Sequence, residues 1–218
     1  MTIPALLLFL GRGAVVTLEI TAMAALVAVI LAFLVGLMRL APYAPIRAVA
    51  TTYVEILRGT SALVQLFYLF FILPLFGITI SPFATAVIGL GLNASAYGAE
   101  VVRTSVAAVE RPQWEAARAL DMPPLMTLRR IILPQAIPLM LPPFGNQLVE
   151  LLKATSLVSL ITLTDLTFAG TQLVTTTGQK QLVWSLVLAF YFVMAYPLSW
   201  LVRCLEKRLG RYRGARAN

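Results

Sequence analysis

Long uncharged apolar runs dominate the pattern of hydrophobic and polar positions in this sequence. Residues 20–38, 60–99 and 181–202 contain no Asp, Glu, Lys or Arg. About 20 apolar residues are enough for a helix to cross the hydrocarbon core of a bilayer. None of these runs alternates between apolar and polar positions as a barrel strand does. The pattern therefore predicts membrane-spanning helices, the first of which is too long to be the apolar region of a signal peptide.

Five spans follow from these runs and from the apolar stretch that ends near residue 160. We place them at residues 14–38, 52–75, 82–106, 137–160 and 181–203. Proline and glycine in segment 73–82 end the second span, because both residues interrupt helices. The composition agrees, since 60% of the residues are hydrophobic, 12% are charged and the mean hydropathy is +0.88. We predict an all-α, polytopic membrane protein that forms one transmembrane domain over residues 1–218.

Basic residues predict the orientation of these spans. Of the 17 Lys and Arg residues, fourteen fall in the links after the first and third spans and in the tail, 203–218. The three exceptions are Arg12, Lys153 and Lys180. Because links rich in Lys and Arg stay in the cytoplasm, we expect the N-terminus outside, the C-terminus inside and the link 107–136 in the cytoplasm.

The link 107–136 is strongly charged for so apolar a chain. Pro112 suits the first turn of a helix, and residues 114–120 can form a short helix that Pro123 and Pro124 end. Its apolar side chains, Ala116, Ala117 and Leu120, are expected on one face. By composition this segment is either an amphipathic linker on the lipid headgroups or an exposed helix that another protein approaches closely.

The spacing in this link resembles the cytoplasmic EAA loop of binding-protein-dependent ABC importer permeases. The pattern of that family is E-A-A, three residues, G, nine residues, then I-x-L-P. The corresponding residues here are Glu115, Ala116, Ala117, Arg118, Asp121, Ile131, Leu133 and Pro134. Asp121 stands where the family has glycine, and Asp tolerates a left-handed backbone better than most residues.

Three further segments, 53–65, 92–103 and 133–157, narrow the resemblance to the polar-amino-acid permeases of the histidine, glutamine and arginine type and to their ectoine-type relatives. Ser61 departs from this subfamily, which usually has proline there. The resemblance implies an importer of a polar amino acid or a related zwitterionic solute in a bacterial inner membrane. The substrate would cross by alternating access between the two sides.

The resemblance also implies partners. The link would form a coupling helix that sits in a cleft of a separate ABC ATPase dimer. This chain has no G-x-x-x-x-G-K-[ST] segment, so ATP and magnesium would be bound by that partner and not by this chain. A second copy or a homologous permease would complete the pore, and a periplasmic or lipid-anchored solute-binding protein would deliver the substrate.

Two other classes of function compete with this interpretation. An ion-coupled secondary transporter or channel would need no ATPase, but such chains usually show an inverted repeat, which we do not find here. A membrane enzyme is disfavoured because the chain has no His and one Cys, so neither a catalytic nor a metal site is expected.

Polar residues inside the predicted spans are candidates for the substrate pathway, because ionisable groups at membrane depth are costly. The candidates are Asn93, Tyr97, Glu100, Glu150, Lys153, Thr155 and Ser156. The first three share one helical face, and at 1.5 Å per residue Asn93 lies about 17 Å into its span, near mid-depth.

These candidates allow two interpretations. In one, Glu150 faces a substrate ammonium, Asn93 supplies amide hydrogen bonds, and a substrate carboxylate is met by Lys153, Thr155, Ser156 or a half-helix that starts near residue 143. In the other, a Glu–Lys or Glu–Arg ion pair joins helices, with Glu150–Lys153 or Glu100–Lys153 as the candidate pairs.

Two features outside the candidate site also carry predictions. Asp165, in the outer link, is expected either to cap a helix or to dock an external binding protein. The glycines in the spans are expected to allow close helix packing; they are Gly36, Gly89, Gly91 and Gly98.

Overall fold

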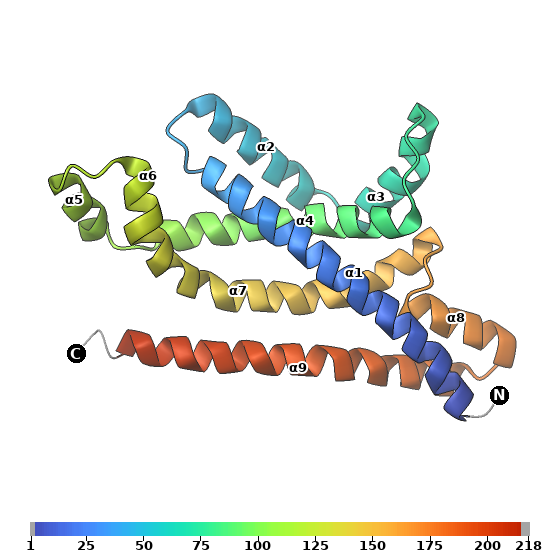
Figure 1. Ribbon diagram of the computed structural model, residues 1–218. Coiled ribbons are helices and arrows are strands. Elements are labelled where there is room, and N and C mark those ends of the chain that lie inside the picture. Colours follow the sequence, from blue (N-terminus) through green and yellow to red (C-terminus); the bar gives the residue numbers. More distant parts are fainter. Residues whose placement is uncertain (1–2, 215–218) are drawn as a thin grey trace.

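The computed structural model describes residues 3–214, with side chains as far as Lys207, and every regular element in this range is helical (Figure 1). The elements are α1 (Ile3–Met38), α2 (Ala44–Gly59), α3 (Ala62–Phe67), η1 (Tyr68–Ile72), η2 (Leu73–Phe76), α4 (Pro82–Ala107), α5 (Arg111–Ala119), α6 (Pro124–Thr127), η3 (Leu128–Ile132), α7 (Leu133–Ala154), η4 (Thr155–Ile161), α8 (Leu166–Thr177) and α9 (Lys180–Gly214). Of the predicted basic tail, Arg216 and the side chains of Arg208, Arg211 and Arg213 lie outside this range.

The helices form an elongated bundle (Figure 1). The long α1 crosses α4 and packs along it, and α7 packs against both α4 and α9. One end of the bundle holds the start of α1 and α8, and the opposite end holds α5, α6 and the end of α9 (Figure 1). The short helices α5 and α6, which contain the predicted coupling segment, therefore lie at the end where the chain finishes.

The helices differ from the predicted spans at several places, and α1 begins at Ile3 and α9 ends at Gly214, each about eleven residues beyond the predicted bound. The prediction of one helix over 52–75 is wrong, because α2 ends at Gly59 and the chain turns by 101° into the segment Ala62–Phe76. The prediction of a new helix start near residue 143 is also wrong, because α7 runs unbroken through Pro138, Pro142 and Pro143.

Two helices, α1 and α9, are long and apolar enough to cross a membrane alone, and two bent pairs would bring the number to four. The helix α4 matches the predicted third span to within one residue, but its polar residues make it less apolar than α1 and α9. Five spans therefore remain a prediction.

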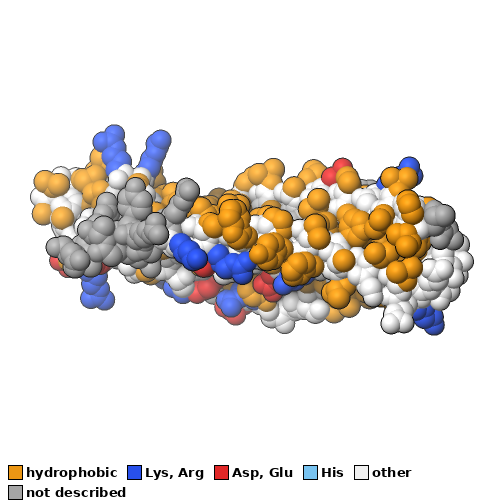
Figure 2. Space-filling view, turned by 90° about the horizontal axis from the view of Figure 1, so that it is seen from below, with side chains coloured by type: hydrophobic (Ala, Val, Ile, Leu, Met, Phe, Trp, Pro, Cys, Tyr) orange, Lys and Arg blue, Asp and Glu red, His pale blue; other side chains and the backbone are white. Residues whose placement is uncertain are grey.

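Hydrophobic side chains cover much of the outside of the bundle (Figure 2). On α9 they include the exposed Leu188, Phe192, Val193 and Trp200. Several Lys and Arg side chains project from the end that holds α5 and α6 (Figure 2). An apolar girdle with basic groups gathered at one end is typical of a protein whose solvent is a bilayer.

Small residues bring α1 and α4 into close contact, as the glycines predicted. A Cβ added at Gly36 would lie 2.8 Å from the carbonyl oxygen of Ala99. A Cβ added at Gly98 would lie 2.7 Å from the Cβ of Ala32 and 3.0 Å from the ring of Phe144. Lipid tails are as apolar as the side chains, so the hydrophobic effect contributes little to the association of helices in a bilayer. Close packing of the backbones contributes instead.

Asp165 caps α8 at the N-terminal end of that helix. Its carboxylate accepts hydrogen bonds of 3.0 Å from the backbone N–H groups of Thr167 and Phe168. The whole residue is buried, so the structure supports the capping role and leaves no exposed carboxylate for docking. The adjacent Leu166 N–H donates to the hydroxyl of Thr17, which ties this cap to α1.

We predict that Gly98→Ala lowers the thermal unfolding temperature of the detergent-purified protein, because the new methyl group forces α1 away from α4. Overpacking of this kind costs about 1–3 kcal/mol. Gly11→Ala is the matched control, since nothing lies within 4 Å of its added Cβ and alanine favours a helix. Equal unfolding temperatures for the two variants would contradict this account of the packing.

Candidate substrate cavity and coupling loop

A cavity of about 260 Å³ lies where the broken second span meets α4 and α7. It is partly polar and opens to the side of the chain. Its lining residues come from the break, from the middle of α4 and from the last turns of α7: Thr60, Ser61, Ala62, Leu90, Asn93, Ala94, Tyr97, Gln147, Glu150, Leu151 and Ala154.

Side-chain hydrogen bonds hold the break open. Thr60 is extended, with φ −119° and ψ 153°, so the last carbonyl groups of α2 have no helical partners. The Gln65 amide donates to the carbonyl of Leu57 at 2.9 Å and to the hydroxyl of Thr60 at 2.7 Å. Asn93 donates to the same Leu57 carbonyl at 3.2 Å. These bonds replace the missing helical ones, which is a requirement for irregular backbone at membrane depth.

Three of the seven predicted pathway residues line this cavity: Asn93, Tyr97 and Glu150. The amide nitrogen of Asn93 is already engaged with Leu57 and Gln65, so this side chain shapes the cavity as well as facing it. Glu150 contributes the one carboxylate among the lining residues.

The structure does not bring the other four predicted residues to the cavity lining. Lys153 is exposed on α7. Thr155 is buried, and its hydroxyl donates back to the carbonyl of Leu152 where α7 tightens into η4. Ser156 lies one residue further, and its carbonyl accepts from Ser159. The change of helical pitch at Thr155 turns this end of the segment away from the cavity.

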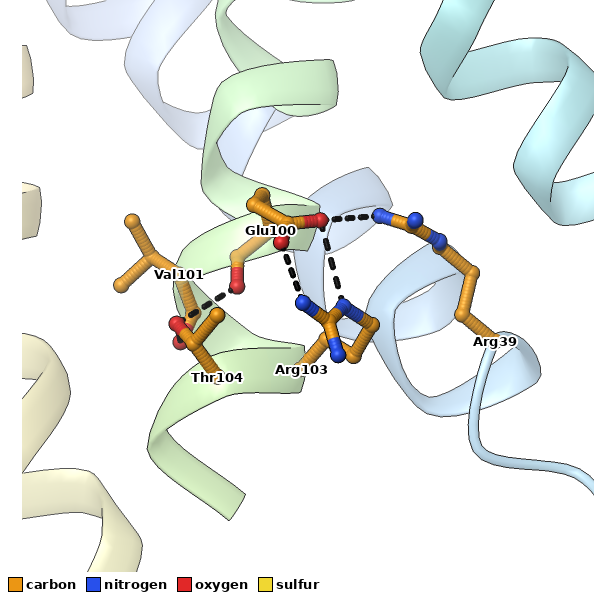
Figure 3. Close-up of polar contacts among 5 residues, drawn as sticks. All are labelled: Arg39, Glu100, Val101, Arg103 and Thr104. Carbon is orange, nitrogen blue, oxygen red and sulfur yellow. Dashed lines mark hydrogen bonds and ion pairs between the residues drawn. The ribbon is translucent and has the colours of Figure 1, made fainter. Parts of the chain in front are cut away.

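Glu100 pairs with two arginines and not with Lys153 (Figure 3). Arg39, just after α1, and Arg103, one turn further along α4, both donate to its carboxylate. The Arg103 Nε–Oε2 distance is 3.2 Å, so this guanidinium uses two of its nitrogens. The side chain of Arg39 is only 12% exposed. The cluster therefore fixes the end of α1 against α4. Glu100 thus joins helices, as the second interpretation predicted, but its partners are two arginines and not Lys153.

We predict that Glu100→Gln destabilises the protein without changing substrate affinity. Removal of the carboxylate leaves two arginines close together and unpaired, and breaking a partly buried pair costs more than breaking an exposed one. Thermal unfolding should begin several degrees lower than in wild type, whereas Glu19→Gln, on the exposed face of α1, should not shift it. A Glu100→Gln protein of normal stability that bound substrate poorly would instead place Glu100 in the pathway.

The predicted coupling loop forms a short helix and a tight reversal. The helix α5 covers Arg111–Ala119 with Pro112 in its first turn. Glu115, Ala116 and Arg118 are exposed, as a contact surface requires. Ala117 is buried, so the prediction of one apolar face is wrong: Ala117 packs inward while Ala116 and Leu120 face outward.

Asp121 occupies the left-handed position that ends α5. Its φ is +51°. Its N–H donates to the carbonyl of Arg118 at 2.9 Å, and the N–H of Met122 donates to Ala117 at 3.0 Å. This pair of bonds is the Schellman arrangement, in which glycine is the usual left-handed residue. The left-handed backbone at this position explains why the family pattern has glycine there, and Asp121 adopts that same conformation.

The last part of the loop motif enters α7. Ile131 lies in η3 and is half-buried, Leu133 begins α7 and is also half-buried, and Pro134 is exposed in the first turn. Trp114 of α5 packs on the apolar cluster that includes Val106 and Ile132. The helix α5, the predicted coupling helix, is therefore anchored to α4 and to the segment that becomes α7.

We predict that Asp121→Gly keeps transport and raises the unfolding temperature slightly, because glycine enters the left-handed region without strain. Asp121→Val should lower both transport and the unfolding temperature, because a β-branched residue is strained in the left-handed region. Unfolding curves and ATP-driven uptake of the two variants check this pair. A severe transport loss in Asp121→Gly would show that the carboxylate itself has a function.

Sequence reasoning missed Thr60, Ser61 and Gln147. The break that brings in Thr60 and Ser61 depends on contacts with α3 and α4, which no local pattern shows. Gln147 could have been found, because it lies three residues before Glu150 on the same helical face. Its amide nitrogen donates to the carbonyl of Ala94, and its Oε1 has no hydrogen-bond partner among the described residues.

Residues 24–211 match the family described as binding-protein-dependent transport system inner membrane component. The chain belongs to this family and is thus a membrane component of a binding-protein-dependent transport system.

Individual relatives agree with the family. A probable amino-acid ABC transporter permease of Sinorhizobium fredii is 44% identical over 95% of this chain and 90% of that protein. The L-cystine transport system permease TcyB of Bacillus subtilis is 37% identical over 93% of this chain and 87% of its own. The glutamine transport system permease GlnP of Escherichia coli is 36% identical, covering 74% of each chain.

Solved structures share the fold. The crystal structure of an amino acid ABC transporter with histidines superposes with a TM-score of 0.88 at 35% identity, covering 95% of this chain and 100% of that one. The inward-facing MetNI methionine ABC transporter gives a TM-score of 0.74 at 19% identity, covering 94% and 99%. At 19% identity, the likeness to MetNI shows only that the two chains share a fold.

Proposed function

We propose that this chain is the permease subunit of an ATP-driven ABC importer that moves a polar amino acid or a related zwitterionic solute across the inner membrane. The observation that carries the proposal is the similarity, over nearly the whole chain, to permeases named for amino-acid transport. The cavity supports it. Its volume of about 260 Å³ is near the lower end of ligand pockets, roughly 300–1,000 Å³, which suits a small solute.

The cavity also offers suitable chemistry. Glu150 can bind a substrate ammonium, and the free Oε1 of Gln147 can accept a further hydrogen bond after a small rotation. The Tyr97 hydroxyl can exchange hydrogen bonds with a polar side chain. The cavity lies at a discontinuous span, the kind of place where transporters bind substrates.

The chain works with partners in this proposal. A second copy or a homologous permease faces the open side of the cavity, an ABC ATPase dimer binds ATP and magnesium, and a solute-binding protein delivers the substrate from outside. The end of the bundle with α5 and α6 faces the cytoplasm, because the basic side chains gather there. The N-terminus then lies outside and the C-terminus inside.

In the coupling step, α5 transmits closure of the ATPases to the permease. Glu115 and Arg118 are exposed on α5, and neither is within 4.0 Å of an oppositely charged side chain in the described part of the chain. Both are therefore available for charge-assisted hydrogen bonds to the ATPase.

We predict that Glu115→Lys abolishes ATP-driven uptake in proteoliposomes that contain this chain, the ATPase and the binding protein. Membrane insertion and thermal unfolding should stay at wild-type values, because Glu115 is exposed and makes no ion pair with another described residue. Glu206→Lys makes the same charge change at an exposed position of α9 and should transport normally. Wild-type uptake by Glu115→Lys would remove the coupling assignment, and ATP-independent uptake by wild type would remove the importer proposal.

A further inference from the structure

The cavity is chemically incomplete for a zwitterion. Its lining contains the carboxylate of Glu150 but no Lys or Arg. An amino acid carries a carboxylate as well as an ammonium, and a carboxylate taken out of water needs a strong donor. Lys153, Thr155 and Ser156 lie away from the lining. If the proposed function holds, another residue must supply this donor.

Arg58 lies beside Tyr97, one of the residues that line the cavity. It belongs to the last turn of α2, two residues before Thr60, and its Cζ is 5.2 Å from the centroid of the Tyr97 ring. Tyr97 itself lines the cavity. Within the described part of the chain, no carboxylate is within 4.0 Å of the Arg58 guanidinium. An arginine beside a polar cavity that has no acidic partner keeps its hydrogen-bond donors available for a ligand.

The backbone around Arg58 is held on both sides. The preceding Leu57 carbonyl accepts from Gln65 and Asn93, and the hydroxyl of Thr60 donates to the carbonyl of Ile56 at 2.8 Å. The end of α2 is thus tied to α3 and α4, which also line the cavity. Little further ordering is then needed when a ligand binds.

The position over Tyr97 leaves the guanidinium free to bind an anion. A cation over an aromatic face is attracted by the ring, while the N–H donors of arginine point outward in its own plane. Those donors match the two oxygens of a carboxylate. Glu150 lines the same cavity as Tyr97, so a carboxylate and the ring that carries the Arg58 guanidinium face one small space.

We propose that Arg58 binds the carboxylate of a zwitterionic substrate, with the Tyr97 ring as its platform and Glu150 as the partner of the substrate ammonium. The proposal rests on the proposed function and extends it. The substrate is then a solute that carries both an ammonium and a carboxylate group. The permease itself excludes amines that lack a carboxylate.

The test measures binding to the permease–ATPase complex in lipid nanodiscs, without the solute-binding protein, so that this partner cannot impose its own selectivity. Radiolabelled L-glutamine, L-cystine and L-histidine are screened first against wild type. The amino acid that binds is then compared with its carboxamide, in which the carboxylate has become a neutral amide.

We expect Arg58→Gln to weaken binding of the amino acid about 10- to 100-fold, as expected for loss of a charged hydrogen-bond donor. Weak binding of the carboxamide should not change. The affinity of Arg58→Lys for the amino acid should lie between those of wild type and Arg58→Gln, because an ammonium cannot donate two parallel hydrogen bonds to a carboxylate. Tyr97→Leu, which keeps Arg58 but removes its platform, should weaken amino-acid binding about 3- to 10-fold.

Arg47→Gln is the matched control, because Arg47 is an exposed arginine of the same helix, three turns from the cavity, bonded to the carbonyl of Ala41. It should bind as wild type does. Equal affinity for the amino acid in Arg58→Gln and wild type would overturn the proposal, and so would equal weakening of the amino acid and the carboxamide. If Arg58→Gln does not fold, wild-type affinity in both Arg58→Lys and Tyr97→Leu overturns it. Failure of wild type to bind or import any amino acid would instead overturn the proposed function.

Discussion

The hydrogen bonds that close the end of α2 are the constraint on which the cavity depends. In a bilayer, a carbonyl group released from a helix finds no water, and each unsatisfied group costs several kcal/mol. Gln65 and Asn93 provide the missing donors to Leu57, and the hydroxyl of Thr60 serves Ile56. The span can therefore break, turn by 101° and expose Thr60 and Ser61. Asn93, which the sequence suggested as a substrate ligand, acts first as part of this framework.

A rigid frame supports that break. Glycine and alanine bring α1 against α4, and the cluster of Glu100 with Arg39 and Arg103 fastens the end of α1 to the same helix (Figure 3). The helix α4 is thus held along its length while it supplies Asn93 and Tyr97 to the cavity. A site whose residues are fixed in this way loses less free energy in ordering side chains when a ligand arrives.

The coupling loop connects to the cavity through the covalent chain. The left-handed turn at Asp121 reverses the chain from α5 into α6, and α6, η3 and α7 follow one another directly. The far end of α7 carries Gln147 and Glu150. In the proposed coupling step, consecutive helical segments therefore connect α5 to one wall of the cavity. The anchoring of Trp114 on the cluster around Val106 and Ile132 keeps α5 from moving independently.

The sequence by itself determined the class of fold and the left-handed turn after α5, and it predicted three residues that line the cavity, Asn93, Tyr97 and Glu150, among seven candidates, because apolar run length, motif spacing and helical periodicity are local properties. It predicted the unusual backbone at Asp121 for the same reason. Only the tertiary structure decided where the second span breaks, which cations pair with Glu100, and that Thr155 and Ser156 turn away while Arg58 lies beside Tyr97. The break, the pairing of Glu100 and the position of Arg58 depend on atoms that are distant in the chain: the Gln65 and Asn93 amides, the Arg39 guanidinium and the Tyr97 ring. Local patterns determine which helices form, and contacts between helices determine which of their polar groups meet.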